Sequence, residues 1–512
     1  MYPGTHAQKT PDKPAVVMVE SGRQLTFRQL EDRSIQLARV LRKAGLRRGD
    51  TVAVLSENQP EVFEVYWAAL RSGLYLTAVN HRLAADEAAY IVDDCDAKAL
   101  IVSAGERERA EVLLDSTPAV RLRLAFGGAV NGHGDYEAAL ARQFAVPLAD
   151  QPRGADLLYS SGTTGRPKGI KAPLPDRQVH EPGDAYTALF STKYGFDDTT
   201  VYLSPAPLYH AAPLRFGGVV QALGGTVHVM AKFDPALALS TIDSARVTHS
   251  QWVPTMFVRM LKLSTEERAQ YDVSSLRSAI HAAAPCPVEV KHAMIDWWGP
   301  ILHEYYSSTE GNGITFIDCH EWLRKPGSVG KAGLGVIRIC DDEGQVVPSG
   351  TNGVVYFERE QVPFEYHKDP AKTKATQHPE HPNWSTTGDI GYLDEDGYLY
   401  LTDRKAFTII SGGVNIYPQE IENCLALHPK VFDVAVIGIP DPEMGESVQA
   451  VVQLPPHVIP SNELAAELQE YVRERIARYK APRGIDFVTE LPRTETGKLL
   501  KRVLRDRYTS RL

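Results

Sequence analysis

The sequence predicts an α/β fold, with a large N-terminal α/β domain of parallel-rich sheets and helices followed by a small C-terminal α+β domain. The first observation behind this prediction is length, because 512 residues are too many for one ordinary hydrophobic core. The second is a rhythm of short apolar runs and helical stretches, which is typical of parallel sheets covered by helices. The third is a change of that rhythm around Asp396, which indicates a second domain.

The strands expected in the N-terminal domain are short and apolar, and the intervals between them leave room for helices. A helix is expected over residues 60–71, because Pro60 stands at its start and Gly73 just past its end. The expected strands are residues 51–55, 98–102, 201–203, 226–230, 247–250 and 301–305.

The domain boundary is predicted at residues 403–406. Before it, residues 391–400 have the pattern of a hairpin whose acidic turn contains Gly397. After it, a strand, a glycine-rich turn and a helix form a fresh unit. We therefore expect an N-terminal domain over residues 1–403 and a C-terminal domain over residues 404–512.

Composition and charge exclude several classes of protein. The chain is 43% hydrophobic and 23% charged, and 55 basic against 64 acidic residues give a net charge of −9. A mildly acidic protein is not expected to bind nucleic acid. No apolar run is long enough to span a bilayer, and the first residues lack the apolar core of a signal peptide. The five cysteines are scattered, so we expect reduced thiols and a cytoplasmic location.

The loop between Tyr159 and Gly169 carries the strongest chemical signal. It holds three glycines, four Ser or Thr hydroxyls and one lysine. Glycines let backbone N–H groups approach an anion, hydroxyls donate further hydrogen bonds, and a lysine adds a point charge. The spacing is not that of the nucleotidase loop, which has Ser or Thr after its lysine. The loop is predicted to hold a polyphosphate through Ser160, Ser161, Gly162, Thr163, Thr164, Gly165 and Lys168.

This loop resembles the signature of the adenylate-forming superfamily, which comprises acyl-CoA synthetases, luciferases and the adenylation domains of peptide synthetases. The resemblance begins near the N-terminus at Pro11-Asp12-Lys13-Pro14-Ala15 and continues to the last lysine-rich stretch. It implies that ATP activates a carboxylic acid to acyl-AMP with release of pyrophosphate, and that transfer to CoA then gives acyl-CoA and AMP. The implied cofactors are ATP, Mg²⁺ and CoA, and the C-terminal domain is implied to be a mobile lid.

The motif Tyr306-Ser307-Ser308-Thr309-Glu310 resembles the Tyr-Gly-x-Thr-Glu motif of this family. The resemblance implies that Tyr306 stacks on adenine, that Thr309 donates to the α-phosphate, and that Glu310 binds Mg²⁺, a hard ion suited to a carboxylate. Ser307 stands where glycine is usual, and a positive φ at that position would strain the loop.

Four more residues acquire roles from the resemblance. Ala283 lies in a turn of small residues that walls the adenine and acyl sites, although a simple helix-capping turn would have the same sequence. Asp389 matches an aspartate that binds the ribose hydroxyls, and Arg404 is a second ribose contact. Lys498 matches a catalytic lysine whose cation lies between the acyl carboxylate and the α-phosphate, where negative charge gathers in the transition state.

The residues around the domain boundary imply a second half-reaction. By resemblance, Gly412 and Gly413 line the tunnel for the pantetheine arm of CoA, and the basic residues around Lys480 meet its phosphates. A solvated helix face is the alternative interpretation of this basic stretch. The lid would then turn about a hinge at Ala406. The chain departs from the family here, because Ala406 and Phe407 replace the charged residues that are usual at these positions.

The acid site is expected beside His210, which would be close to the bound carboxylate or to the pantetheine exit. A packed histidine with a purely structural role is the alternative at this position. Its walls are expected within residues 210–217, 282–284 and 306–315, with no arginine obvious for a second carboxylate. A medium-chain or aromatic monoacid would suit such walls. The small residues that point to this conclusion are Ala211, Ala212, Ala283 and Gly313.

Two other functions remain open at this point. The chain could pass its acyl group to an amine, as an amide synthetase, or to a separate carrier protein, and the unusual hinge keeps this reading open. It could also be a nucleotide- or acyl-binding protein that has lost catalysis. The complete set of motifs argues against this alternative. A homodimer is the default expectation for the oligomeric state.

Overall fold

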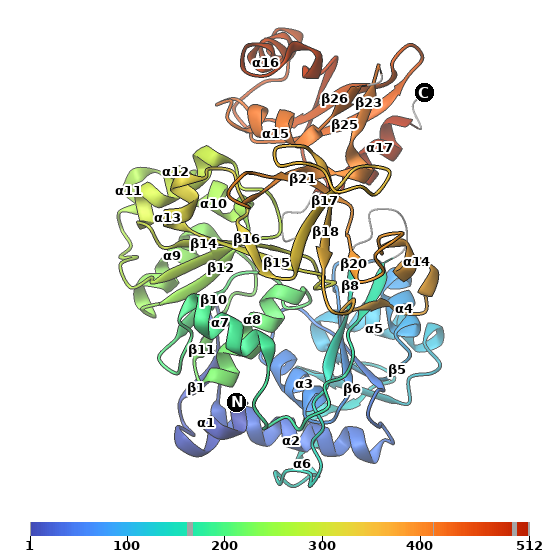
Figure 1. The fold of residues 1–512 in the computed structure, drawn as a ribbon. Coiled ribbons are helices and arrows are strands. Elements are labelled where there is room, and N and C mark those ends of the chain that lie inside the picture. The colour runs from blue at the N-terminus through green and yellow to red at the C-terminus, as the bar shows by residue number, and fades with distance from the viewer. Residues whose placement is uncertain (1, 161–166, 413, 494–498, 510–512) are drawn as a thin grey trace.

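The computed structural model describes residues 2–160, 167–412, 414–493 and 499–509, and within them the chain forms four sheets. Figure 1 shows two large sheets with their helices in the lower part of the molecule. The third sheet lies above them, and the last sheet, orange to red, lies at the upper end. The predicted mixed α/β architecture is confirmed, as is the smaller α+β unit at the C-terminus.

The nine-stranded sheet has the order β16-β15-β14-β13-β12-β10-β11-β1-β2 and is parallel from β14 to β1. Its strands are β1 (Pro14–Met18), β2 (Gln24–Thr26), β10 (Val201–Ser204), β11 (Thr226–Val229), β12 (His249–Trp252), β13 (Ser278–His281), β14 (Leu302–Ser307), β15 (Ile314–Asp318) and β16 (Lys331–Leu334). The helices that precede or separate them include α1 (Pro3–Lys9), α7 (Ala185–Tyr194), α8 (Ala211–Leu223), α9 (Pro235–Ser244), α10 (Pro254–Leu261), α11 (Thr265–Arg268), α12 (Val288–Trp298) and α13 (Cys319–Arg324).

The eight-stranded sheet has the order β19-β9-β8-β4-β3-β5-β6-β7, with parallel pairing from β8 to β7. Its strands are β3 (Thr51–Leu55), β4 (Tyr75–Val79), β5 (Ala97–Ser103), β6 (Leu122–Phe126), β7 (Gly134–Asp135), β8 (Ala155–Ser160), β9 (Lys168–Lys171) and β19 (Glu365–Tyr366). Its helices are α2 (Phe27–Lys43), α3 (Glu61–Leu70), α4 (Ala85–Asp94), α5 (Arg107–Ser116) and α6 (Tyr136–Ala141). Each of the six strands given above for the N-terminal domain is present in one of these two sheets, with ends shifted by at most two residues.

Two smaller sheets follow. The third is antiparallel and contains β17 (Val336–Cys340), β18 (Gly353–Glu358), β20 (Trp384–Ser385), β21 (Asp389–Leu393) and β22 (Leu399–Arg404), with α14 (Pro370–Ala375) before β20. The C-terminal sheet contains β23 (Ile409–Ser411), β24 (Val414–Ile416), β25 (Asp433–Asp441), β26 (Gly445–Gln453) and β27 (Gly484–Val488), with α15 (Pro418–Ala426), α16 (Asn462–Arg475) and α17 (Lys501–Thr509). The expected hairpin is formed by β21 and β22.

The two large sheets share one hydrophobic core, which runs through α3 and α8. Every residue of α3 is buried, and Trp67 on this helix donates its indole N–H to Gln221 on α8 over 2.7 Å. The helices approach closely because α8 has glycine where they cross: a Cβ on Gly217 would lie 2.6 Å from the Phe63 ring. This contact fixes the two sheets relative to each other. Within the described ranges, no helix combines the length and apolar character needed to cross a membrane.

Gly330 lies where the third sheet joins the nine-stranded sheet. Leu399 accepts a backbone hydrogen bond from Val329 and donates one to Gly330, both over 2.9 Å. The φ of Gly330 is +97°, and a Cβ at this position would lie 2.0 Å from the carbonyl oxygen of Phe316. No side chain fits between the backbone of Gly330 and that of Phe316.

We expect Gly330→Ala to lower the free energy of unfolding by more than about 4 kcal/mol, because the backbone at residue 330 would have to move away from that of β15. Gly350→Ala is the matched control: its φ is +81° but nothing lies within 4 Å of the added Cβ. The control should lose only about 1–2 kcal/mol, the usual cost of a left-handed alanine. Equal losses in denaturant unfolding would show that the steric argument at Gly330 is wrong.

Candidate functional site

Strand β8 delivers the predicted polyphosphate loop to the carboxyl edge of its sheet. Leu157 and Leu158 are buried, and the strand ends at Ser160. β9 returns antiparallel from Lys168, which is the Cα partner of Ser160, so the two ends of the loop lie side by side. Both ends are therefore placed where an anion could meet them. The remaining predicted residues of the loop, Ser161, Gly162, Thr163, Thr164 and Gly165, lie outside the described residues.

Lys168 and Glu310 both contact Tyr366, a residue that the sequence analysis did not predict. The Lys168 ammonium lies 5.0 Å from the centre of the Tyr366 ring, and the Tyr366 hydroxyl donates to the Glu310 carboxylate over 2.8 Å. Burial, followed by the positive charge of Lys372, lowers the pKa of Lys168. Two cations and one carboxylate thus converge, which suits phosphate oxygens together with a divalent cation. Tyr366 lies in the two-residue strand β19 and Lys372 in α14, and neither belongs to a recognisable motif.

The Asp389 carboxylate is the centre of a second cluster. It is 6% exposed and accepts hydrogen bonds from the hydroxyls of Tyr306 over 2.6 Å and Thr387 over 2.9 Å. Arg404 forms an ion pair with its other oxygen over 2.9 Å. Burial and the charge of Asp389 raise the pKa of Tyr306 well above its usual value, and the same charge raises the pKa of Arg404. The structure therefore brings together three residues that the sequence analysis assigned to one nucleoside.

The turn between β14 and β15 differs from what the sequence led us to consider. Ser307 lies in β14 as the extended partner of Ile314, and its hydroxyl donates to the Gly313 carbonyl over 2.8 Å. A positive φ is therefore not required where glycine is usual. Thr309 and Glu310 follow in the turn itself, and both are half-buried.

Ala283 occupies a strained position at the carboxyl end of β13. Its φ is +76°, in the left-handed region that costs a non-glycine residue about 1–2 kcal/mol. The side chain is exposed, although Ala282 beside it is buried. The turn thus presents a single methyl group at the same edge of the sheet as the end of β14.

The expected acid site is less open and more polar than the sequence indicated. His210 is the N-cap residue of α8, with its ring 4.4 Å from that of Tyr209. A Cβ on Gly313 would lie 1.9 Å from the Phe357 ring, so Gly313 makes room for a neighbouring side chain and not for a ligand. Sequence analysis also overlooked Arg215 on α8, which forms a two-bond ion pair with Asp156 of β8 over 2.7 and 2.8 Å.

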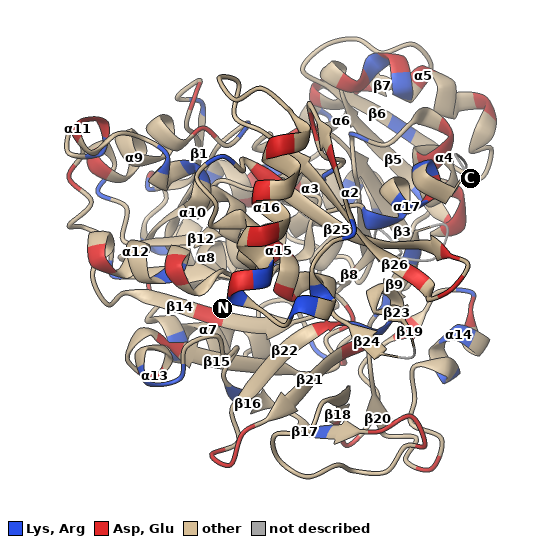
Figure 2. Cartoon of the chain, turned by 90° about the horizontal axis from the view of Figure 1, so that it is seen from above, with Lys and Arg blue, Asp and Glu red and all other residues tan. Residues whose placement is uncertain are grey.

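The residues assigned to the CoA step lie in the C-terminal unit. Lys480, in a short 3₁₀ turn (Arg478–Lys480), forms an ion pair with Glu420 over 2.5 Å. Figure 2 shows acidic residues along α16. The basic residues of this helix lie in its last turn, and α15 carries Glu420 and Glu422 but no Lys or Arg. Gly412 has a φ of +57° and donates its N–H to Met444 over 2.8 Å. Gly413 and Lys498 lie outside the described residues.

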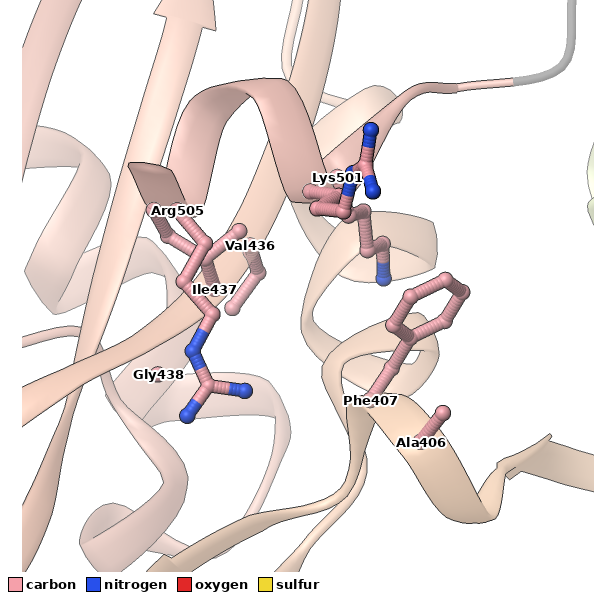
Figure 3. Close-up of a pocket in the computed structure, with 8 residues that line it drawn as sticks. Ala406, Phe407, Val436, Ile437, Gly438, Lys501 and Arg505 are labelled. Carbon is pink, nitrogen blue, oxygen red and sulfur yellow. The ribbon is translucent and has the colours of Figure 1, made fainter. Parts of the chain in front are cut away.

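The predicted hinge is bonded on both sides. Lys405 donates its backbone N–H to the carbonyl of Gly388, in the N-terminal part of the chain, over 2.8 Å. The Asp403 carboxylate accepts the N–H of Gln419, at the start of α15, over 3.0 Å. In Figure 3 the Phe407 ring points toward the Lys501 ammonium, which lies 5.4 Å from the ring centre. The cavity there is about 270 Å³ in volume and is lined by Ala406, Phe407, Val436, Ile437, Gly438, Lys501, Arg502 and Arg505.

Comparisons with known proteins identify the family of this chain. The family model described as AMP-binding enzyme matches residues 4–367, and the AMP-binding enzyme C-terminal domain matches residues 420–498. A feruloyl-CoA synthase from Amycolatopsis sp is 33% identical over 99% of this chain and 98% of its own length. The long-chain-fatty-acid–CoA ligase FadD13 of Mycobacterium tuberculosis is 32% identical over 98% and 97%. The structure of the amide bond synthetase McbA from Marinactinospora thermotolerans is similar with a TM-score of 0.82, at 26% identity over 99% and 100%.

We expect Asp389→Asn to weaken ATP binding roughly tenfold to a hundredfold, because charge-assisted hydrogen bonds contribute about 1.5–3 kcal/mol each. Titration calorimetry with ATP in the absence of an acid measures the effect. Asp394→Asn is the matched control, since Asp394 pairs with the surface residue Lys325 just beyond the same strand. Equal affinities in the two variants would contradict the role of Asp389.

Proposed function

The chain belongs to the family of AMP-binding enzymes, and we propose that it joins a carboxylic acid to CoA in two steps. First, a carboxylate oxygen attacks the α-phosphorus of ATP, the bond to the bridging oxygen breaks, and pyrophosphate leaves. Then the CoA sulfur, as thiolate, attacks the acyl carbon, and AMP leaves with its phosphate oxygen. The chain is thus an AMP-forming acid–thiol ligase. The observation that carries this proposal is the Asp389 carboxylate held between Tyr306 and Arg404, from two sides of the predicted domain boundary.

The nucleotide would occupy the edge where both large sheets end. Asp389 and Arg404 would take the ribose hydroxyls, since a carboxylate accepts two donors well. Tyr306 would flank the adenine, with Ala283 as the opposite wall. The triphosphate would extend toward Lys168 and the loop that begins at Ser160. The contacts of Asp389 with Tyr306 and Arg404, and of Lys168 with Tyr366, support this arrangement.

A magnesium ion fits the donor set beside Lys168. Among the described residues, no group of three or more His, Cys, Asp or Glu side chains is placed to hold a metal. Mg²⁺ is commonly bound by one or two carboxylates together with substrate phosphates, so Glu310 as a single protein ligand suffices. When bound, the ion would neutralise charge on the phosphates. The Tyr366 hydroxyl would hold the Glu310 carboxylate in place for it.

Charge stabilisation during the first step falls to Lys498 and Thr309. A cation between the acid carboxylate and the α-phosphate lowers the energy of a transition state that gathers negative charge. Thr309 would donate a hydrogen bond to the same phosphate. His210, at the start of α8, would lie beside the carboxylate or the entering thiol.

The two steps would use two positions of a C-terminal lid, residues 404–512, that turns about residues 403–406. Lys498 would act in the first position, and Gly412, Gly413 and Lys480 in the second. The hydrogen bonds of two neighbouring residues support a pivot here. Asp403 is bonded to α15 of the C-terminal unit, whereas Lys405 is bonded to Gly388 of the N-terminal part. Lys480 would have to leave Glu420 to meet a CoA phosphate.

Transfer to an amine is the second candidate function. The likeness to the amide bond synthetase McbA over the whole chain favours it, as does the departure from the family at Ala406 and Phe407. Transfer to a carrier protein and a non-catalytic binding role are the remaining alternatives. We also propose a cytoplasmic location and a homodimer, and the five cysteines are all free.

Pyrophosphate release across a panel of carboxylic acids, with and without CoA, tests the function. We expect release that depends on one class of acid and that CoA accelerates several-fold, because the thioester step removes the bound acyl-AMP. Release that amines accelerate and CoA does not would replace the proposal with an amide synthetase. No release with any acid would support a non-catalytic protein.

Lys498→Ala and Gly413→Leu should separate the two steps. The first variant should lose adenylation by roughly a hundredfold or more, as expected when a charge that stabilises a transition state is removed. It should still form acyl-CoA from supplied acyl-AMP. The second variant should adenylate normally and fail with CoA, because its side chain would block the tunnel. If one variant lost both steps equally, the assignment of that residue would be wrong.

A further inference from the structure

A stack of aromatic rings fills the space between α8 and β14. The Phe216 ring on α8 is stacked on Phe190 with centroids 4.4 Å apart, on Tyr202 at 6.3 Å and on Tyr305 at 6.0 Å. Phe216 and Tyr202 are almost completely buried, whereas Tyr305 is half-buried. The rings therefore form a solid layer of which Tyr305 is the accessible member. An alkyl chain has no passage through packing of this kind.

Tyr305 is also held in position by hydrogen bonds. The Gln251 amide donates to the Tyr305 hydroxyl over 2.9 Å, and the Tyr202 hydroxyl donates to the Gln251 carbonyl over 3.4 Å. Side chains alternate along a strand, so Tyr305 and Tyr306 face opposite sides of β14. Tyr306 faces Asp389, and Tyr305 faces α8, which begins at His210. We place the acid beside His210 at the start of α8, and therefore on the side of β14 that Tyr305 faces.

The wall beside this layer carries a neutralised charge. Arg215 and Asp156 are 17% and 11% exposed, and their two parallel hydrogen bonds leave the pair without net charge. The guanidinium lies 5.4 Å from the centre of the Tyr186 ring. The Tyr186 hydroxyl in turn reaches the turn after β14, within 3.7 Å of where a Cβ on Gly311 would be. Such a wall offers hydrogen bonds to a neutral polar group and little attraction for a second carboxylate.

We propose that Tyr305 and the Arg215–Asp156 pair determine which acid this enzyme accepts. The acid is a compact aromatic monocarboxylic acid with a neutral hydrogen-bonding substituent on its ring. Long alkyl acids are excluded by the Tyr305 layer, and dicarboxylic acids are disfavoured because Asp156 neutralises the Arg215 guanidinium that could otherwise bind a second carboxylate. This inference rests on the proposed function, and it separates the acids named for the two relatives described above, a feruloyl-CoA synthase and a long-chain-fatty-acid–CoA ligase.

The length limit is tested by kcat/KM for pyrophosphate release with 4-hydroxycinnamate and palmitate. The wild type should prefer 4-hydroxycinnamate, and Tyr305→Ala should shift the ratio toward palmitate by roughly tenfold or more, as expected when a blocking group is removed from a pocket. Tyr305→Phe keeps the ring and should still exclude palmitate. The KM for ATP should stay unchanged in both variants, which a general structural defect would not allow. A wild type that prefers palmitate, or an unchanged ratio in Tyr305→Ala, would overturn the proposal.

The charge limit is tested by a gain of function with benzene-1,4-dicarboxylate. Asp156→Asn leaves the Arg215 charge free, so kcat/KM for the diacid relative to benzoate should rise roughly tenfold, the effect of a new charge-assisted hydrogen bond. The diacid should also raise the Tm of this variant. In the matched control, Asp156→Asn with Arg215→Met, both effects should be absent. The same ratio in all three proteins would remove Arg215 and Asp156 from the proposal.

Failure of the proposed function gives a different result from failure of this inference. A wild type that releases pyrophosphate with the opposite preference contradicts the inference alone. A wild type that releases none with any acid contradicts the proposed function. Calorimetric binding of 4-hydroxycinnamate and palmitate in the presence of AMP then still decides between the two acids.

Discussion

The buried carboxylate of Asp389 is the constraint on which the site depends. Hydroxyls of Tyr306 and Thr387 and the guanidinium of Arg404 surround it, from three separate segments of the chain. Removing Arg404, whose side chain is 37% exposed, would leave the nearly buried carboxylate with two neutral donors only, which is unfavourable for its charge. Arg404 can therefore move away only if other donors take its place, and the hydroxyls of a ribose are such donors. Under the proposed function, occupancy of the ribose site and the position of the chain after Arg404 would be coupled through one carboxylate.

The fold brings the rest of the site to this carboxylate through its two parallel sheets. Parallel strands present their carboxyl ends at one edge, and β8 and β14 contribute Ser160 and Tyr306 at such edges. The contact between α3 and α8 holds the two sheet edges at a fixed relative position, because the glycines of α8 let the helices pack closely. The third sheet then carries Asp389 and Arg404 on paired positions of β21 and β22.

The sequence predicted the parts of the site that lie in contiguous motifs. The ends of the phosphate loop, the Tyr306 motif, Asp389 and Arg404 could be named as candidates because each motif has a fixed local spacing. Tyr366 with Glu310 and Arg215 with Asp156 were missed because their partners are 56 and 59 residues apart, and only the folded chain brings them together. Gly313 looked like an open wall because nothing in the sequence shows that Phe357 fills its place.

The Arg215–Asp156 pair has a consequence for the evolution of this enzyme. A substitution of either residue alone leaves one charge buried without its partner, and such an intermediate is less stable than either end point. Two changes would have to be fixed almost together, or the first would need a stabilising change elsewhere. Substrate range around this wall should therefore drift slowly among descendants of this protein, and it should change in paired steps when it changes.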